Sequence, residues 1–247
     1  MDWMKPRVLA IIPAHNEATN LPIVIEDLRG QFALSDIVVV NDCSIDETER
    51  AARNLGVRVL SLPFNLGIGG AVQTGLKYAE DEGYDIAVQF DGDGQHIAQE
   101  IPMLLAPLLE GQSDIAVGSR YLEDRGYKTP LFRKMGMVFS LWLTSVVIRQ
   151  KLSDITSGFR AWNRKAIIVF AQDYPMSFAG VESSISAYYC GLRLIEMPAH
   201  FRTRISGKSS INFWRSFYYP FKTVVAALGV VMRRSDHVRS VAKRQGE

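Results

Sequence analysis

Short apolar runs alternate with helix-like stretches through the first half of the chain, and each run stops at a polar loop. Such runs are typical of strands that are buried on both faces of a sheet. There are five of them: Val8–Ile12, Ile37–Val40, Val57–Leu60, Ile86–Phe90 and Ile115–Gly118. Strands that alternate with helices form a mostly parallel sheet with right-handed crossovers. The sequence therefore predicts an α/β fold, with a mostly parallel central sheet flanked by helices.

The stretches between these runs are predicted helices. Ser44 and Glu47 have capping-box spacing, so a helix is expected to start there and to end at Gly56. The other helices are expected at about Asn20–Arg29, from Asn65–Gly70 to about Gly83, and at Ala98–Leu109, Leu131–Ile148 and Glu182–Cys190, with a further strand at Leu194–Met197.

Two carboxylates follow the strand Ile86–Phe90 directly, in the segment Asp91-Gly92-Asp93-Gly94-Gln95-His96. Residues two apart in an extended chain point the same way, so Asp91 and Asp93 can share one cation. Carboxylate oxygens suit Mg²⁺ or Mn²⁺, and magnesium is usually held by one or two carboxylates together with substrate phosphates. Asp-Gly pairs are also common in turns, but α/β proteins place ligands at strand ends. A metal site is therefore the preferred interpretation.

Other segments suit the phosphates of a metal-bound nucleoside diphosphate. The glycine-rich helix start at Asn65–Gly70, which includes Gly67, can receive phosphate on its N–H groups. Arg204 and Lys208 supply cations for a diphosphate. Asp42, at the end of another strand, can accept hydrogen bonds from a base or ribose, although capping a helix is a serious competing role.

The composition of the chain indicates what kind of partner and which compartment this chemistry involves. The net charge of +2 hides ten Lys/Arg against two Asp/Glu in residues 201–247, which points to an anionic partner. No nucleic-acid-binding motif accompanies these residues, so a membrane surface is favoured over nucleic acid. No stretch reaches the roughly 20 apolar residues that span a bilayer, and no convincing signal peptide is present. The only cysteines, Cys43 and Cys190, lack metal-site spacing and fit a reducing cytoplasm.

Two later segments combine apolar and basic residues. Leu131–Ile148 carries Arg133 and Lys134 near its start and then becomes strongly apolar. It is either a core helix or an interfacial helix with its cations at the lipid headgroups. In Phe213–Met232, aromatic residues occur together with cations, as at membrane interfaces. We therefore expect a main domain at residues 1–210 and an amphipathic tail at residues 211–247, which contacts a membrane or another subunit.

Seven motifs follow one another along residues 8 to about 210. They are Pro13–Glu17, Asn41–Asp46, Asn65–Gly69, Asp91–His96, Gly118–Arg120, Asp154–Arg160 and Arg204–Ser209. In this order they resemble the family-two glycosyltransferases of the GT-A type, and most of all the polyprenyl-phosphate sugar synthases of the dolichyl-phosphate mannose kind. The resemblance implies metal-dependent, inverting transfer of a sugar from a nucleotide-diphosphate sugar to polyprenyl phosphate at the cytosolic face of a membrane.

The resemblance also implies roles for single residues. Pro13, Glu17 and Asp42 would line the nucleoside pocket, Asp91, Asp93 and Gln95 would hold Mg²⁺ or Mn²⁺, Arg120 with Arg133 or Lys134 would hold the acceptor phosphate, and Arg204 and Lys208 would meet the donor diphosphate. Family members usually have a serine shortly after the basic residue, where this chain has Met135–Met137. Many also carry C-terminal transmembrane helices, of which one short apolar segment remains here. A second copy or a small membrane protein is therefore an expected partner.

The acceptor decides which side chains are needed. A hydroxyl acceptor requires a general base, for which Asp154 and Glu182 are the candidates. A phosphate monoester is largely dianionic at pH 7 and needs cations, such as Arg120, instead. We favour phosphate, so that Asp154 orders its loop and Glu182 is solvated. The alternative is transfer to a hydroxyl of a glycan or lipid-linked saccharide, and a non-catalytic sugar-nucleotide-binding subunit is disfavoured by the intact metal motif.

Overall fold

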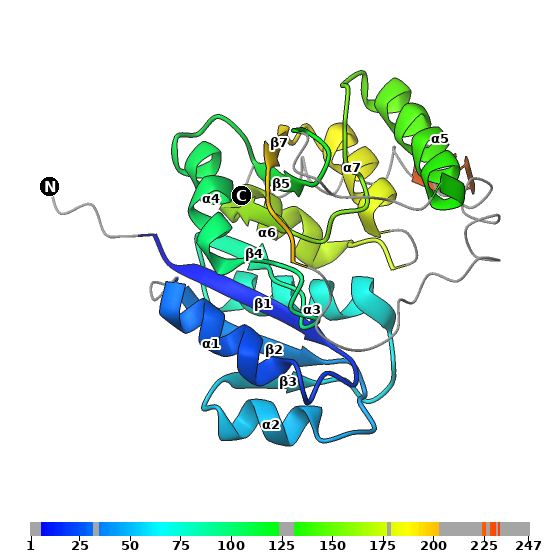
Figure 1. The fold of residues 1–247 in the computed structure, drawn as a ribbon. Helices are drawn as coiled ribbons and strands as arrows, with labels where there is room; N and C mark the ends of the chain where they lie inside the picture. Colours follow the sequence, from blue (N-terminus) through cyan, green and yellow to red (C-terminus); the bar gives the residue numbers. More distant parts are fainter. Residues whose placement is uncertain are drawn as a thin grey trace, which may run out of the picture.

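The computed structural model describes residues 6–31, 35–123, 131–176, 179–202, 224–225, 228–230 and 232. Its centre is a seven-stranded sheet in the order β3-β2-β1-β4-β6-β5-β7 (Figure 1). The strands are β1 (Val8–Ala14), β2 (Ser35–Asn41), β3 (Arg58–Ser61), β4 (Ile86–Gln89), β5 (Ile115–Ser119), β6 (Arg160–Asn163) and β7 (Leu194–Pro198). Neighbouring strands are parallel except at β6, which is antiparallel to β4 and β5. The predicted fold class is confirmed.

Helices cover both faces of this sheet. The helices α1 (Leu21–Gln31), α2 (Thr48–Asn54) and α4 (Ile101–Leu109) pack on one face, and α3 (Gly67–Asp81) and α6 (Arg164–Gln172) pack on the other. A short 3-10 helix, η1 (Ala98–Glu100), leads into α4, and α5 (Leu131–Ile148) packs against α7 (Ala179–Tyr189). The predicted helix at Leu131–Ile148 therefore has the expected bounds.

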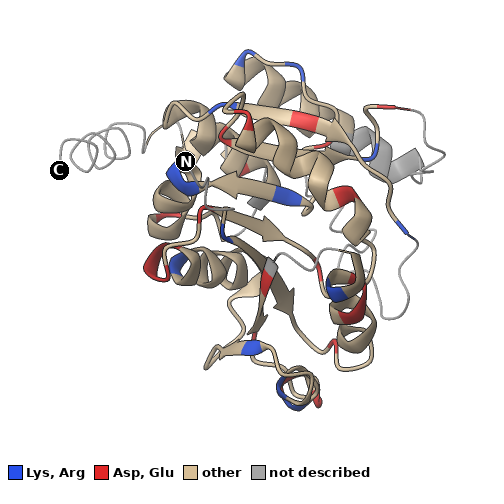
Figure 2. Ribbon diagram, turned by 90° about the vertical axis from the view of Figure 1, so that its left-hand side faces the viewer, with Lys and Arg blue, Asp and Glu red and all other residues tan. Residues whose placement is uncertain are grey.

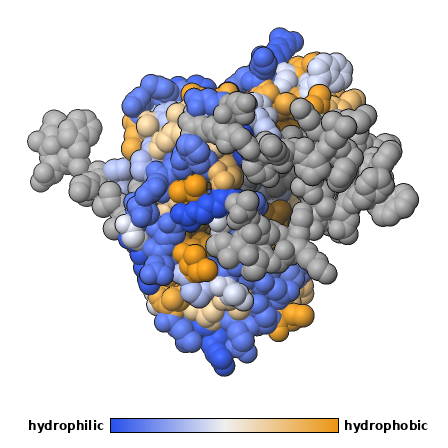
Figure 3. Space-filling view, in the orientation of Figure 1, coloured by the Kyte–Doolittle hydropathy of each residue, from blue (hydrophilic) through white to orange (hydrophobic). Residues whose placement is uncertain are grey.

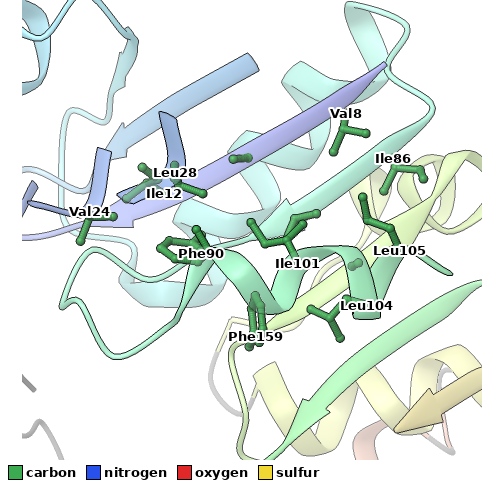
Figure 4. Close-up of a cluster of buried hydrophobic side chains, with 14 of the residues drawn as sticks. Val8, Ile12, Val24, Leu28, Ile86, Phe90, Ile101, Leu104, Leu105 and Phe159 are labelled. Carbon is green, nitrogen blue, oxygen red and sulfur yellow. The ribbon is translucent and has the colours of Figure 1, made fainter. Parts of the chain in front are cut away.

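Strand side chains divide between two buried clusters because successive residues of a strand point to opposite faces. In β1, Val8 and Ile12 face α1 and α4, together with Phe90 and Leu104 (Figure 4). Leu9 and Ile11 point to the opposite face, toward α3 and α6. Each such aliphatic or aromatic side chain contributes about 1.5–3 kcal/mol when it is fully buried. The two clusters hold the sheet rigid, so the loops at its edge are fixed in place.

The expected helix start at Ser44 is wrong, because α2 begins at Thr48. The hydroxyl of Ser44 accepts the backbone N–H of Asn16 at 3.0 Å, and the N–H of Thr48 is bonded by Asp46 at 3.0 Å. Cys43 takes a left-handed conformation, with φ 54°. Ser44 thus ties the loops after β1 and β2 together, and the helix starts one turn later.

Helix α5 packs Leu141, Leu143 and Val147 against a buried cluster, but it also exposes apolar residues and buries two small polar ones. Ser140 and Thr144 are fully buried, whereas Val138, Trp142 and Val146 are 52–59% exposed. Hydrophobic residues reach the surface at the upper right of Figure 3, where Figure 1 places α5. A surface helix normally buries its apolar stripe. No helix in the described part of the chain has the length and apolar character needed to cross a membrane.

Charged residues of both signs are interspersed over the described ribbon rather than gathered on one face (Figure 2). The basic excess of the sequence lies in residues 201–247, most of which are outside the described residues. The surface of the described residues therefore has no large region in which charges of only one sign gather.

Candidate active site

The polar segments predicted to bind ligand follow strand ends that lie at one edge of the sheet. Ala14 of β1 pairs with Asn41 of β2, and β4, the other neighbour of β1, ends at Gln89. The antiparallel strand β6 starts at this same edge, next to the end of β5. This arrangement brings the segment before β6, residues 154–159, between the acidic loop after β4 and the loop that carries Arg120 after β5.

The two predicted metal carboxylates lie on the loop after β4 and differ in exposure. The side chain of Asp91 is 29% exposed, and its Oδ1 accepts an N–H from Gln89 at 2.7 Å. Asp93 is buried, and its Oδ1 accepts the backbone N–H of Gln95 at 3.0 Å. Among the described residues there is no group of three or more His, Cys, Asp and Glu side chains that could hold a metal. Two hard carboxylates fit Mg²⁺ or Mn²⁺ with substrate phosphates completing the shell.

A buried histidine, His96, is hydrogen-bonded to the backbone of the acidic loop after β4. Its Nδ1 accepts the backbone N–H of Asp91 at 2.9 Å, so the neutral ring carries its proton on Nε2, 3.6 Å from Asp91 Oδ2. The rings of Phe90, Phe159 and Phe201 enclose it, with centroids 4.8–5.5 Å away. Burial lowers the pKa of His96, although the nearby carboxylates oppose this shift. A neutral imidazole in this cage fixes the backbone of Asp91.

Two glycines allow the backbone to approach the acidic loop closely. A Cβ at Gly158 would lie 2.7 Å from Asp91 Oδ2 and from Gln89 Nε2. A Cβ at Gly92 would lie 3.3 Å from the carbonyl oxygen of Pro13 and 3.6 Å from Glu17 Cγ. The acidic loop is therefore packed against both the segment before β6 and the end of β1. This packing joins the predicted metal and nucleoside residues in one site.

Asp42 is buried at the end of β2, where its carboxylate caps a helix that is distant in sequence. Its two oxygens accept the backbone N–H groups of Leu66 at 2.7 Å and Gly67 at 2.9 Å, at the start of α3. Gly67 has φ 77°, a conformation that glycine adopts without strain. The capping role therefore accounts for both carboxylate oxygens of Asp42. Pro13 and Glu17 lie beside this loop, and the N–H of Glu17 is bonded by Thr48 at 2.8 Å.

Arg120 is clamped by a buried acid, Asp154. The Nε and Nη2 atoms of Arg120 donate to the two oxygens of Asp154 at 2.6 and 2.8 Å, and Nη2 also donates to the hydroxyl of Thr156 at 2.6 Å. Asp154 accepts three further hydrogen bonds, from the N–H of Arg120 and from the N–H and hydroxyl of Thr156. A bidentate pair fixes the plane of a guanidinium as well as its position.

Arg160, the last residue of its motif, is buried behind the site. Its guanidinium donates to the carbonyls of Ser157, Ile155 and Gly180 and to the hydroxyl of Ser183. The part of the chain that the structure describes places no carboxylate within ion-pair distance of it. Arg160 thus stabilises the loop that carries Asp154 and Gly158 and has no path to a ligand.

The remaining predicted site residues are only partly described. Arg133 and Lys134 lie in the first turn of α5, but their side chains are outside the described residues, as are Arg204 and Lys208 entirely. Glu182 lies half-buried in the first turn of α7. The sequence did not single out His96, Gly158 and Thr156, although all three lie within the motifs noted above.

Comparisons with known proteins agree with this geometry. The model of "Glycosyl transferase family 2" matches residues 9–169. An undecaprenyl-phosphate mannosyltransferase of Micrococcus luteus is 32% identical to this chain, over 83% of this chain and 88% of its own. A UDP-N-acetylglucosamine–dolichyl-phosphate N-acetylglucosaminyltransferase of Methanococcus voltae is 31% identical, over 67% of this chain and 72% of its own.

A solved structure shares the fold at lower identity. Glucosyl-3-phosphoglycerate synthase of Mycobacterium tuberculosis, crystallised with Mn²⁺, UDP and glucosyl-3-phosphoglycerate, superposes with a TM-score of 0.68 at 18% identity. The superposition covers 91% of this chain and 80% of that one. The shared architecture extends over nearly the whole chain.

Proposed function

Because the chain belongs to glycosyl transferase family 2, we propose that it transfers a sugar from a nucleotide-diphosphate sugar to a polyprenyl phosphate. The two relatives named above are both, by their names, transferases to a polyprenyl phosphate, undecaprenyl phosphate in one and dolichyl phosphate in the other. Their sugars differ, since one transfers mannose and the other N-acetylglucosamine. The acceptor class is therefore the shared property, and the transferred sugar is a hexose or an N-acetylhexosamine.

The observation that carries this proposal is the pairing of Arg120 with Asp154. The side chain of Asp154 has no exposed surface, and its oxygens accept five hydrogen bonds. A substrate hydroxyl has no approach to it, so it does not serve as a general base. Arg120 is 17% exposed and places a cation at the sheet edge. A cation backed by an inaccessible acid suits a phosphate acceptor, which is already largely dianionic at pH 7, better than a hydroxyl.

In this mechanism an oxygen of the acceptor phosphate attacks the anomeric carbon, and the nucleoside diphosphate leaves from the opposite face. Arg120 orients the acceptor phosphate, together with Arg133 or Lys134. Asp91 and Asp93, with Gln95, would hold a divalent ion, which would supply positive charge next to the diphosphate leaving group. A single displacement inverts the anomeric configuration, so an α-linked donor gives a β-linked lipid product.

In this proposal the nucleotide-sugar donor binds where β1 and β2 end, along the same edge of the sheet. Pro13 and Glu17 line the nucleoside pocket in this proposal, and Asp42 shapes the pocket by holding the start of α3. Gly67 and the N–H groups that follow it in α3 lie at a helix N-terminus, where phosphate is favoured. Arg204 and Lys208 complete the diphosphate site from a segment outside the described residues.

We place the enzyme peripherally on the cytosolic face of a membrane, where a polyprenyl headgroup is accessible. The outward apolar side chains of α5, Val138, Trp142 and Val146, support this placement, as do the exposed Arg149 and Lys151 that follow the helix. Apolar burial and cation attraction act together in interfacial binding.

A transfer assay tests the proposed reaction. Purified protein with Mg²⁺ or Mn²⁺ is incubated with labelled GDP-mannose, UDP-glucose or UDP-N-acetylglucosamine and a polyprenyl phosphate in mixed micelles, and the label extracted into organic solvent is counted. One donor is expected to label the lipid, with inverted configuration by NMR. The same polyprenol without phosphate is the matched control. Labelling of that alcohol, or of a soluble glycan alone, contradicts the proposal in favour of a hydroxyl acceptor.

The metal assignment has its own test in Asp93→Asn. The variant loses a negative ligand at the diphosphate, so turnover should be abolished while the melting temperature stays close to that of the parent. Near-normal turnover of a folded Asp93→Asn protein, with either Mg²⁺ or Mn²⁺, would remove Asp93 from the metal site.

A further inference from the structure

A second acid, the partly buried Glu196 on β7, lies behind the clamp on Arg120. Its Oε1 accepts the backbone N–H of Asp154 at 2.7 Å. Its Oε2 accepts the backbone N–H of Ser153 at 2.6 Å and the hydroxyl of Ser153 at 2.9 Å. Both oxygens are thus used by donors from two consecutive residues of the loop before β6. Burial raises the pKa of Glu196, and these N–H donors oppose the rise.

The chemistry of this contact requires a carboxylate rather than any polar side chain. Each oxygen of Glu196 accepts a backbone N–H, from Ser153 at one oxygen and from Asp154 at the other, so an amide in its place would turn its NH₂ group toward one of these two N–H groups. A buried donor left without an acceptor is destabilising. The loop would therefore move away from β7 if Glu196 lost one of its two acceptor oxygens.

The loop before β6 links Glu196 to Arg120, the residue proposed to bind the acceptor phosphate, through a continuous series of hydrogen bonds. Asp154, whose backbone is held by Glu196, holds both donor edges of Arg120 with its side chain. The hydroxyl of Ser153 also forms a hydrogen bond of 2.6 Å with the hydroxyl of Ser119, which is the residue directly before Arg120. Glu196 therefore fixes the position of the Asp154 carboxylate, and the carboxylate fixes the guanidinium plane.

We propose that Glu196 is a positioning residue for acceptor binding, which acts through Asp154 on Arg120. The inference rests on the proposed role of Arg120 toward the acceptor phosphate. Glu196 does not touch the substrate itself. A small displacement of a group that orients a reactant is enough to cost up to about 10²-fold in rate, so the geometry of this relay matters even though its first member is remote.

Strands β5 and β7 provide a matched control at the ends that lie away from the site. Asp114, just before β5, accepts the backbone N–H of Arg193, just before β7, at 2.8 Å. It also accepts the side-chain N–H of Asn163 at 3.0 Å. Asp114 is thus a buried carboxylate that joins the starts of β5 and β7, and it lies away from the strand ends that carry the site. Asp114→Asn lowers stability at this strand pair without disturbing Arg120.

The experiment compares Glu196→Gln, Asp114→Asn and Arg120→Ala. Binding of geranylgeranyl phosphate, and separately of GDP and UDP with Mn²⁺, is measured by calorimetry, with the melting temperature of each variant. Glu196→Gln is expected to weaken binding of geranylgeranyl phosphate about tenfold and to leave nucleotide binding within about twofold of the parent. Asp114→Asn should lower the melting temperature and leave both ligands unaffected. The double variant Arg120→Ala/Glu196→Gln should bind the lipid phosphate no more weakly than Arg120→Ala alone.

The outcomes separate this inference from the proposed function. If Arg120→Ala binds geranylgeranyl phosphate as the parent does, the role of Arg120 fails, and the positioning role fails with it. If Arg120→Ala weakens binding but Glu196→Gln does not, only the positioning role is overturned. Additive losses in the double variant overturn it as well. Should Glu196→Gln fail to fold, Ser153→Ala removes one of the three donors and must give a smaller loss in the same direction, and unchanged binding there refutes the relay.

Discussion

At the scale of single residues, the site depends on how closely side chains and backbone approach one another. Asp91 receives a hydrogen bond from Gln89, lies 3.6 Å from the ring of His96 and packs against the backbone of Gly158. Three residues therefore surround the carboxylate that we propose as a metal ligand. The carboxylate is preorganised before the donor arrives, which is the condition for electrostatic stabilisation of a leaving group.

Gly158→Ala tests this packing directly. The new methyl group would lie 2.7 Å from Asp91 Oδ2, so the carboxylate must move, and we expect Mn²⁺ affinity and turnover to fall by tenfold or more. Gly30→Ala is the control, because a Cβ there has no atom within 4 Å and the helix should gain about 0.5–1 kcal/mol. Wild-type Mn²⁺ affinity in Gly158→Ala would show that the contact is not required.

At the scale of elements, one carboxylate joins the end of β2 to the start of α3. Asp42 supplies acceptors for two N–H groups that a helix start leaves unsatisfied. Asp42→Ala should lower the free energy of unfolding by about 1–2 kcal/mol, measured by urea denaturation, and Asp42→Asn should lower it less because one acceptor remains. Equal stability of Asp42→Ala and the parent would mean that water replaces the cap without cost.

The strand pair β5–β7 gives a prediction for pH. Burial alone would raise the pKa of Asp114, but hydrogen bonds from Arg193 and Asn163 and the nearby Lys165 together hold it below its ordinary value. A lowered folded-state pKa stabilises above the unfolded value and loses that contribution as pH falls through the folded value. At pH 7, Asp114→Asn should therefore cost about 1–3 kcal/mol. Chemical denaturation at several pH values should find this difference shrinking below about pH 4, and a difference independent of pH would contradict the assignment.

At the scale of the whole molecule, α5 exposes Val138, Trp142 and Val146, although other apolar residues of the helix pack on the protein. Ile148 and Val230 meet in a separate small cluster with α7, and Val225 and Leu228 are exposed beside it. A lipid surface that covers these side chains would explain an orientation that water does not favour.

Flotation with anionic vesicles tests this surface. The full-length protein should float at low salt, and Trp142→Ser/Val146→Ser should float less, because the apolar term is reduced while about 1 kcal/mol per nearby Lys or Arg remains. Ile23→Ser/Leu109→Ser removes two exposed apolar residues elsewhere and should float like the parent. If the parent stays at the bottom even with polyprenyl phosphate present, then a second copy or a small membrane protein becomes the better occupant of α5.

Several features of the fold follow from local pattern. The apolar runs predicted β1 to β5. A strand buried on both faces must be apolar throughout, whereas β3, the outermost strand, is only partly buried. The position of Asp91 directly after β4 placed the acidic loop at a strand end. By contrast, β6 and α6 were not expected, since Arg160–Asn163 is a four-residue strand that begins with a charged residue and has neither an apolar run nor an alternating pattern.

What the sequence by itself determined is the set of groups that carry the chemistry, and the tertiary structure decided how they are used. Sequence alone left Asp154 either a base or a loop residue, and Asp42 either a ligand or a cap. The structure shows what each carboxylate contacts. Asp154 meets Arg120 from 34 residues away and Glu196 from 42 residues away, and Asp42 caps the start of α3. Hydrogen bonds between distant segments leave no periodic signal in the chain. They arise only when the antiparallel strand β6 is inserted between β4 and β5, which brings its preceding loop to the edge where the site lies.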